Sequence, residues 1–330
     1  MHFWATYGLF LAKIVTVVFA ILIVMAGVLA IARKGKSAGK NKLVIKKINQ
    51  RFQDLAETLN MEILDKKAFK ALVKQQKSAE KKHKDKENKK RIFALQFHGD
   101  IKASAVASLR EEITAILQVA TPDDEVVVRL ESSGGLVTAY GLAASQLERI
   151  RKRNIPLTVT VDKVAASGGY MMACVANRIL AAPFAVIGSI GVIAQVPNFH
   201  RLLKKKDIDF EQLTAGEYKR TLTLFGENTE KARLKFQAEI EEVHQLFKNF
   251  IQQNRPIINI QEVATGEHWL ASKAQELKLV DELITSDDYL LNASQQADIY
   301  EIRYTAKKSL TEKLGIAVQT AYSWFNWRAL

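Results

Sequence analysis

The stretch of this chain that most constrains its fold is Val161–Gly191, VDKVAASGGYMMACVANRILAAPFAVIGSIG. It begins at the end of an alternating apolar run, residues 157–161, which predicts a buried strand. The small residues 165–169 follow, and then an apolar helical pattern over 170–175. Ser167 is therefore expected at a strand-to-helix junction, where the first N–H groups of a helix lack intrahelical partners and carry partial positive charge. A nucleophile would suit this place, although a serine here could also simply cap the helix.

Short apolar runs alternate with helical patterns along most of the chain, which predicts an α/β fold with parallel strand pairing. Strands are expected at 93–97, 126–130, 157–161, 178–182, 190–195 and 208–213, with a last short run at 280–284. Helices are expected at 106–119, 137–150, 228–253, 261–266 and 271–277. The pair Gly134-Gly135 falls where a predicted strand ends and a helix begins, so its N–H groups could face a developing oxyanion.

A serine nucleophile needs a base, and none of the six histidines carries a sequence signal for that role. Lys219, in the segment TAGEYKRT, is the alternative. A lysine acts as a base only where desolvation and nearby donors disfavour its charged form. Ser189, in IGSIG, is a candidate for holding it. Lys219 could equally be one of many surface lysines.

The net charge of +13 is confined to one segment. Residues 33–91 hold 20 Lys/Arg against 7 Asp/Glu, so the rest of the chain is neutral. The uncharged apolar run 14–32 precedes this segment and is long enough for a helix across a bilayer. The basic residues therefore indicate a juxtamembrane segment near anionic lipid. Nucleic acid is not expected as a partner, because no aromatic residues are interleaved with the lysines.

Two further features concern cofactors and the chain's end. The lone cysteine, Cys174, lies in an apolar helical pattern and is expected in the core, unable to form an intrachain disulfide. No His, Cys or carboxylate cluster has metal-ligand spacing, so neither a metal nor another cofactor is expected. The amphipathic tail 311–327 suits a membrane surface or a partner subunit.

Four motifs occur in order between about residues 92 and 285: SSGG at a strand end, DKVAASGGY, IGSIGV, and the segment containing Gly216, Tyr218 and Lys219. Together they resemble the signal peptide peptidase A family of Ser-Lys proteases. One position departs from the family pattern, because Ser133 stands where proline usually precedes the paired glycines. The turn at Gly134 is thereby expected to be less rigid.

The resemblance implies a role for each matching residue. Ser167 would be the nucleophile and Lys219 the general base, with Ser189 hydrogen-bonded to the lysine. The N–H groups of Gly168 and of the Gly134-Gly135 turn would form the oxyanion hole.

The resemblance also implies a crotonase/ClpP-like spiral of ββα units and ring-shaped homo-oligomers whose active sites are shared between protomers. Substrates would be cleaved signal peptides and other apolar segments near the membrane. The chain then divides into an N-terminal transmembrane anchor (1–32), a polybasic helical linker (33–91), a Ser-Lys peptidase domain (92–285) and a C-terminal extension (286–330).

Attachment to the bacterial inner membrane by a single span is expected, but the side of the peptidase domain stays open. The positive-inside rule places residues from 33 onward in the cytoplasm, whereas the resemblance suggests the periplasm. Two other functions also stay open: a crotonase-type acyl-CoA enzyme, and an inactive scaffold that binds anionic lipid or nucleic acid through residues 33–91.

Overall fold

The computed structural model describes residues 7–8, 10–19, 42–84 and 90–305, and the chain divides into two compact units. One comprises Met1–Leu43 with Tyr304–Leu330, and the larger one is Val44–Arg303. Residues 10–19 are helical. No helix in the described part of the chain is both long and apolar enough to cross a bilayer. Most of the predicted span 14–32 and the whole tail 311–327 lie outside the described residues.

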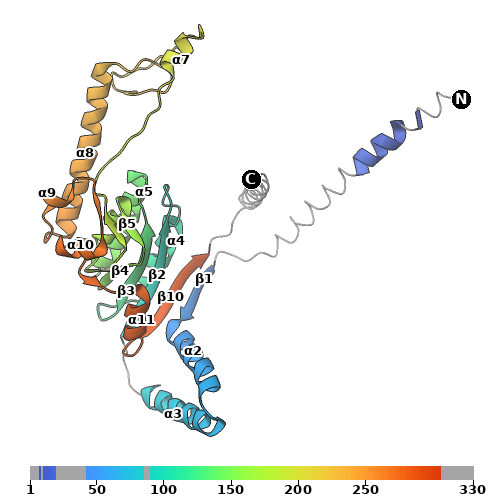
Figure 1. Cartoon of the computed structure of the whole chain (residues 1–330), viewed down its shortest axis with the longest axis vertical. Helices are drawn as coiled ribbons and strands as arrows, with labels where there is room; N and C mark the ends of the chain where they lie inside the picture. Colours follow the sequence, from blue (N-terminus) through green and yellow to red (C-terminus); the bar gives the residue numbers. More distant parts are fainter. Residues whose placement is uncertain (1–6, 9, 20–41, 85–89, 306–330) are drawn as a thin grey trace. The chain divides into compact units, whose positions relative to one another are not determined.

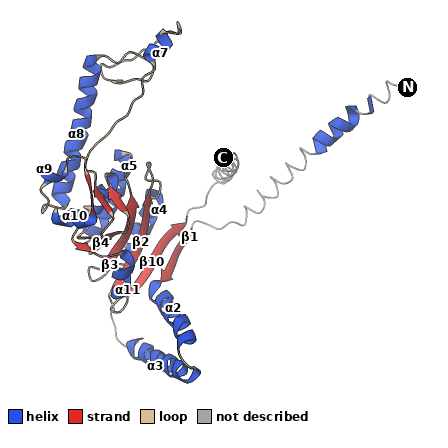
Figure 2. Ribbon diagram, in the orientation of Figure 1, coloured by secondary structure: helices blue, strands red, loops and turns tan. Residues whose placement is uncertain are grey.

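The larger unit is an α/β fold around a mixed sheet (Figure 2). The main path of the sheet runs in the order β1(Lys42–Lys47), β10(Asp298–Thr305), β2(Arg91–Gly99), β3(Glu125–Ser132), β4(Leu157–Val161), β6(Arg178–Ala181), β9(Glu282–Leu283). Three short strands leave this path: β5(Val164–Ala166), β7(Val186–Gly188) and β8(His268–Leu270). β5 pairs in parallel with both β3 and β7, and β8 pairs antiparallel with β7.

The helices of the larger unit connect these strands (Figure 1). They are α2(Ile48–Ile63), α3(Lys66–Lys84), α4(Val106–Ile116), α5(Val137–Arg151), α6(Gly168–Ala173), α7(His200–Lys204), α8(Glu230–Asn254), α9(Ile260–Val263), α10(Ala271–Glu276) and α11(Ser286–Ala293).

The central strands are buried on both faces, as is typical of a parallel sheet covered by helices. All five residues of β4 are buried, and β3 is buried at every position except Arg129 and Glu131. Successive strand side chains point to opposite faces. The core therefore lies on both sides of β3 and β4, and the ends of these strands are held rigidly.

A buried carboxylate holds the N-terminal ends of β3 and β4 in place. Glu125, the first residue of β3, accepts hydrogen bonds from Lys90 Nζ at 2.7 Å, from Thr158 Oγ1 at 2.7 Å and from Tyr289 Oη at 2.5 Å. Burial raises the pKa of Glu125, but the hydrogen bonds from Lys90, Tyr289 and Thr158 outweigh it, so the pKa lies below its ordinary value. The ionised form is thus the one that the fold stabilises.

Most predicted elements are confirmed, but two predicted strands are wrong. Residues 190–195 and 208–213 form no strand and belong to a long excursion that contains α7 and precedes α8. Residues 208–211 alternate apolar and polar and 190–194 are largely apolar, yet side chains such as Ile193, at 80% exposure, have no neighbouring strand to cover them. Alternation predicts a strand only where a partner strand is available.

The sheet also contains residues that the sequence assigned to the linker and the C-terminal extension. β1 and β10 form its edge, and α11 and α2 pack on the same apolar cluster as Ile92 and Ile299. Asn49 in α2 ties these pieces together, because its side chain donates to the carbonyls of Ser294 and Ala297 and accepts from the Ile299 N–H. Helix α3 continues to Lys84, within the segment 33–91 for which the sequence predicts a polybasic helical linker.

Candidate active site

Ser167 lies between strand β5 and helix α6, as the sequence predicts. Its φ is 52° and its ψ −120°, a conformation that costs a non-glycine residue about 1–3 kcal/mol. Two backbone bonds hold this turn: the Ser167 N–H donates to Gly188 O at 2.8 Å, and Ser167 O accepts from the Met171 N–H at 2.9 Å. The side chain is half-buried at a sharp turn directly before a helix.

The predicted glycine turn lies directly against this serine. Gly134 has a φ of +90°, which favours glycine. A Cβ atom on Gly134 would lie 2.7 Å from the Gly168 nitrogen and 2.8 Å from Ser167 Cβ. The structure thus brings Gly134, Ser167 and Gly168 together, although they come from two different strand-to-helix turns.

The N–H groups of these turns are not equivalent. The Gly134 N–H donates to Ser132 Oγ at 3.1 Å and is already occupied. In the described part of the chain, the N–H groups of Gly135 and Gly168 donate to no acceptor. Gly168 is the first residue of α6, so its N–H has no intrahelical partner. Both groups belong to the turns that meet at Ser167 and are free to bind an anion.

Ser189 is placed beside Ser167 by strand register. Ala166 at the end of β5 pairs with Gly188 at the end of β7, so the two serines follow the ends of neighbouring parallel strands. Ser189 has the same φ of 52°, and its N–H donates to Glu267 O at 2.6 Å. Parallel strands lie about 4.8 Å apart, so the two turns form one continuous edge.

Lys219 lies elsewhere in the same chain. It is exposed, on the loop between α7 and α8, and its N–H donates to Gly216 O at 3.2 Å. The adjacent Glu217 forms an ion pair of 2.6 Å with Lys231 in the first turn of α8. The described residues show no contact between Lys219 and Ser167.

Helix α8 separates the two predicted catalytic residues. Its fully buried residues, Phe247 and Ile251, both lie near its C-terminal end, which contacts α6. At 1.5 Å per residue, Lys231 and Ile251 are about 30 Å apart along the helix. In Figure 1, α7 lies towards one end of α8, whereas α9 and α10 lie at the other end. Lys219 and Ser167 of one chain are thus associated with opposite ends of α8.

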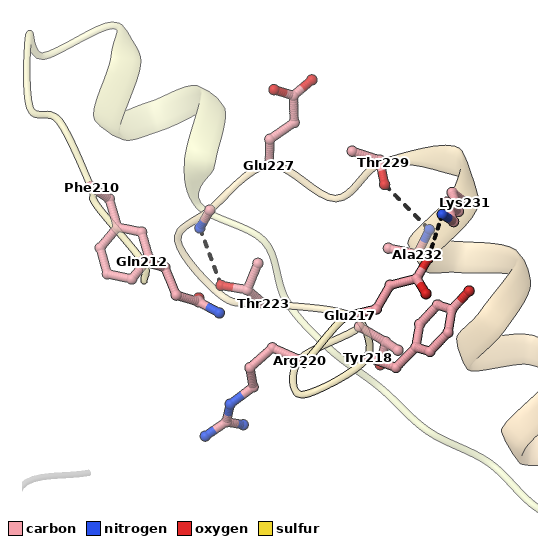
Figure 3. Close-up of a pocket in the computed structure, with 12 residues that line it drawn as sticks. Phe210, Gln212, Glu217, Tyr218, Arg220, Thr223, Glu227, Thr229, Lys231 and Ala232 are labelled. Atoms are coloured by element: carbon pink, nitrogen blue, oxygen red, sulfur yellow. Dashed lines mark hydrogen bonds and ion pairs between the residues drawn. The ribbon is translucent and has the colours of Figure 1, made fainter. Parts of the chain in front are cut away.

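The loop around Lys219 forms a polar cavity of about 390 Å³ at the start of α8 (Figure 3). Glu217 and Lys231 are joined across one side of it, and Tyr218 lies beside Lys231. Thr229 Oγ1 accepts from the Ala232 N–H and caps α8. This cavity contains neither Ser167 nor the glycine turns, so it is separate from the edge described above.

An ion pair that the sequence did not indicate joins a buried arginine at the end of α8 to an exposed aspartate between α10 and β9. Arg255, at the C-terminal end of α8, is 5% exposed and binds Asp281 through two bonds of 3.0 and 2.8 Å. Its Nε donates to Lys278 O at 2.9 Å. An arginine directly after a long amphipathic helix could have signalled such an anchor, but its partner is unpredictable without the fold.

Cys174 is fully buried in the core, which confirms the expectation from its apolar neighbours. Burial raises the pKa of its thiol well above the ordinary value. Its neighbour Tyr170 is equally buried, and its hydroxyl donates to Leu279 O at 3.0 Å. In the part of the chain that the structure describes, no three His, Cys, Asp or Glu side chains are grouped so that they could hold a metal ion.

Comparisons with known proteins identify the chain's relatives. Residues 2–147 match the model "Peptidase family S49 N-terminal", and residues 149–300 match "Peptidase family S49". The "Probable protease SohB" of Haemophilus influenzae is 50% identical over 94% of this chain and 91% of its own length. The "Probable protease SohB" of Buchnera aphidicola subsp. Schlechtendalia chinensis is 48% identical over 88% of this chain and all of its own length.

The stretches LREEIT, YGLAASQLE, TAGEYKRTLTLFGENTE and QEVATGEHW also predict similarity to the inner-membrane peptidase SohB, which these relatives confirm. Among solved structures, a mutant of the 1510-N membrane-bound stomatin-specific protease in complex with a substrate peptide aligns with a TM-score of 0.41 and 16% identity. The alignment covers 70% of this chain and 98% of that one. The family models and the curated relatives together show that the chain belongs to peptidase family S49 and is a serine protease.

Proposed function

We propose that the chain is a membrane-anchored endopeptidase with a Ser167–Lys219 dyad. The observation that carries the proposal is the placement of Ser167 at a strained turn, beside the free N–H groups of Gly168 and Gly135. Such donors stabilise negative charge that develops on a carbonyl oxygen during acyl transfer. The strain is retained because the strand and helix on either side are buried.

In the proposed reaction, Ser167 Oγ attacks the substrate carbonyl while Lys219 takes the hydroxyl proton. The oxyanion is bound by the N–H groups of Gly168 and Gly135. Collapse of this intermediate breaks the peptide bond, and Lys219 gives its proton to the leaving amine. Water then hydrolyses the acyl-enzyme with Lys219 again as the base. Ser189, on the neighbouring turn, orients the lysine.

We further propose that Lys219 reaches Ser167 of a neighbouring protomer in a ring-shaped homo-oligomer. The separation of the two residues along α8 supports this arrangement. The exposed apolar side chains of α8 and of the excursion before it, such as Leu213 and Leu234, also support it. Burial between subunits would supply the desolvation that a neutral lysine needs.

Membrane attachment is proposed through the apolar run 14–32, with residues 33–91 near anionic lipid. The substrates would be apolar or unfolded segments close to the membrane, including remnants of signal peptides. We propose a crotonase/ClpP-like spiral for the body, which the short strands β5, β7 and β8 beside the main sheet support. The side of the membrane is testable with alkaline phosphatase fused after Lys90, since activity there would refute a cytoplasmic location.

The dyad is tested by single and mixed variants of the full-length protein. Ser167→Ala and Lys219→Ala should each abolish casein cleavage, and together should lose no more than either alone, because the two residues act as one unit. The control is Lys206→Ala, an exposed lysine of the same excursion, which should retain normal turnover. Near-normal turnover in Ser167→Ala or Lys219→Ala would contradict the mechanism.

Mixing the two inactive variants tests the shared site. Under conditions that permit subunit exchange, some interfaces would carry both intact residues, and part of the activity should return. If subunits tagged with two fluorophores exchange and no activity appears, the site is not shared.

A further inference from the structure

A buried tyrosine contacts both turns that carry the proposed oxyanion donors. Tyr140 on α5 is fully buried. Its hydroxyl donates to Asp100 O at 2.8 Å and lies 2.6 Å from Ser132 Oγ. Because the tyrosine proton is used on Asp100, the bond to Ser132 must be donated by the serine hydroxyl. Ser132 in turn accepts the Gly134 N–H at 3.1 Å.

These bonds form a chain in one direction, from the Gly134 N–H through Ser132 and Tyr140 to the Asp100 carbonyl. Each hydroxyl in it donates once and accepts at least once, and both are buried, with Ser132 at 2% exposure. Hydrogen bonds in such a chain strengthen one another, and the loss of one member leaves a buried partner unsatisfied. The chain therefore fixes the Gly134 turn relative to the core.

The ring of Tyr140 contacts the second turn. A Cβ atom on Gly168 would overlap Tyr140 Cγ and would lie 2.8 Å from both its Cβ and its Cδ1. Gly168 therefore packs directly against the base of the Tyr140 ring. The packing is equally close at the hydroxyl end of Tyr140, because a Cβ atom on Gly99 would overlap Ser132 Oγ and Tyr140 Oη.

We propose that Tyr140 is a positioning residue that sets the distance between the two oxyanion donors, Gly135 N–H and Gly168 N–H. Its hydroxyl holds one turn through Ser132, and its ring supports the other. The bond chain restrains a turn in which Ser133 occupies the position usually taken by proline. The inference rests on the proposed function of Ser167 and assigns Tyr140 no direct contact with substrate.

The test compares two buried tyrosines in the full-length protein. Tyr140→Phe keeps the ring and removes the hydroxyl that completes the chain. Tyr170→Phe is the matched control, because its hydroxyl is equally buried but donates to Leu279 O, outside the chain. Kinetics with a chromogenic peptide ester give kcat and KM, and urea unfolding gives the stability of each variant. Binding of a peptide aldehyde reports the oxyanion hole, because its hemiacetal oxygen occupies that position.

Loss of a single oxyanion donor costs about 100- to 1,000-fold in kcat, so displacement of donors that are still present should cost about tenfold. We expect Tyr140→Phe to lower kcat about tenfold with KM within about twofold, and to weaken aldehyde binding by the same factor as kcat/KM. Tyr170→Phe should lose similar stability while kcat and aldehyde binding stay normal. Equal kinetic losses in both variants, or a normal kcat in Tyr140→Phe, would overturn the proposal.

Two further variants keep the test decisive. If Tyr140→Phe does not fold, Ser132→Ala removes the middle of the chain without touching the ring and should give the same kinetic pattern; normal kinetics there would also overturn the inference. Ser167→Ala distinguishes a failure of this inference from a failure of the proposed function on which it rests. Full turnover in Ser167→Ala would reject the serine mechanism itself, whereas an inactive Ser167→Ala beside a fully active Tyr140→Phe would reject only the role of Tyr140.

Discussion

The close approach of Gly134 to the nucleophile gives a prediction whose size can be worked out from the structure. In Gly134→Ala, a non-glycine residue is forced to a φ of +90°, which costs about 1–2 kcal/mol. The new methyl group also lies 2.7 Å from the Gly168 nitrogen and 2.8 Å from Ser167 Cβ, so backbone must move. Overpacking of this kind costs about 1–3 kcal/mol more. The free energy of unfolding should therefore fall by about 2–5 kcal/mol.

Two other glycines separate these contributions. Gly266 has a similar φ of +87° but open space around a Cβ, so Gly266→Ala measures backbone strain alone, at about 1–2 kcal/mol. Gly141 lies inside α5 with nothing near a Cβ, so Gly141→Ala should stabilise the protein by up to about 1 kcal/mol through helix propensity.

Urea denaturation of the three variants and the parent protein gives the ranking directly. Turnover of a peptide ester measures the local effect, because Gly134→Ala shifts the serine and the Gly168 donor together. It should lose more than about 100-fold in kcat, the size of one lost oxyanion donor, while Gly141→Ala stays at the parent value. A loss of stability in Gly134→Ala no greater than in Gly266→Ala would refute the packing argument. Normal turnover in Gly134→Ala would refute the location of the site.

Two predictions concern the framework around the site. Arg255→Ala removes a buried guanidinium that binds the exposed Asp281 and the Lys278 carbonyl, and it should lower the free energy of unfolding by about 1.5–3 kcal/mol, measured by urea denaturation. Arg178→Ala is the control: it breaks the Arg178–Glu282 pair, in which both side chains are exposed, and should cost less than about 1 kcal/mol. The pKa of Glu125 is lowered in the folded protein, so the stability that it contributes is complete above its ordinary value of 4.5 and is lost as the pH falls through the lowered value. Unfolding free energies measured from neutral pH to about pH 3 should consequently fall less steeply in Glu125→Gln than in the parent protein, and an unchanged slope would contradict the assignment.

The sequence predicts much of the site because most of its parts follow strand ends. Ser167, Ser189 and Gly134 each come directly after a strand, or two residues after it, and these strands are neighbours in the sheet. The carboxyl ends of neighbouring parallel strands meet at one edge, so residues in these positions converge without further information. Lys219 has no such constraint, because it lies in a loop whose position is set by packing on α8.

The residues that sequence reasoning did not predict are those whose roles depend on long-range contacts. In the sequence, Tyr140 is one more apolar position on the face of α5. Only the distances from its hydroxyl to Asp100 O and Ser132 Oγ reveal a polar role. Strands β1 and β10 were not predicted because charged residues interrupt them and their outer faces are partly exposed. Strands whose faces are partly exposed lack the continuous apolar run that marks a strand buried on both faces.

The position of β10 between β1 and β2 has a consequence for how the protein is made. Synthesis proceeds from the N-terminus, so both neighbours leave the ribosome long before β10, which ends at Thr305. Until then the edge of β2 lacks a partner on that side, and the apolar cluster around Ile92 and Ile299 is incomplete. An unpaired strand edge of this kind readily binds other extended chains.

Completion of the sheet is thus an insertion between two strands made earlier and not a sequential addition of strands. Pairing of segments so far apart in the chain is slow, because the closure entropy of the whole intervening domain is lost before the contact forms. The edge of β2 that faces β10 would therefore stay unpaired while the strands between β2 and β10 are made. The pairing of β10 with β1 and β2 would then be the last step in completing this sheet.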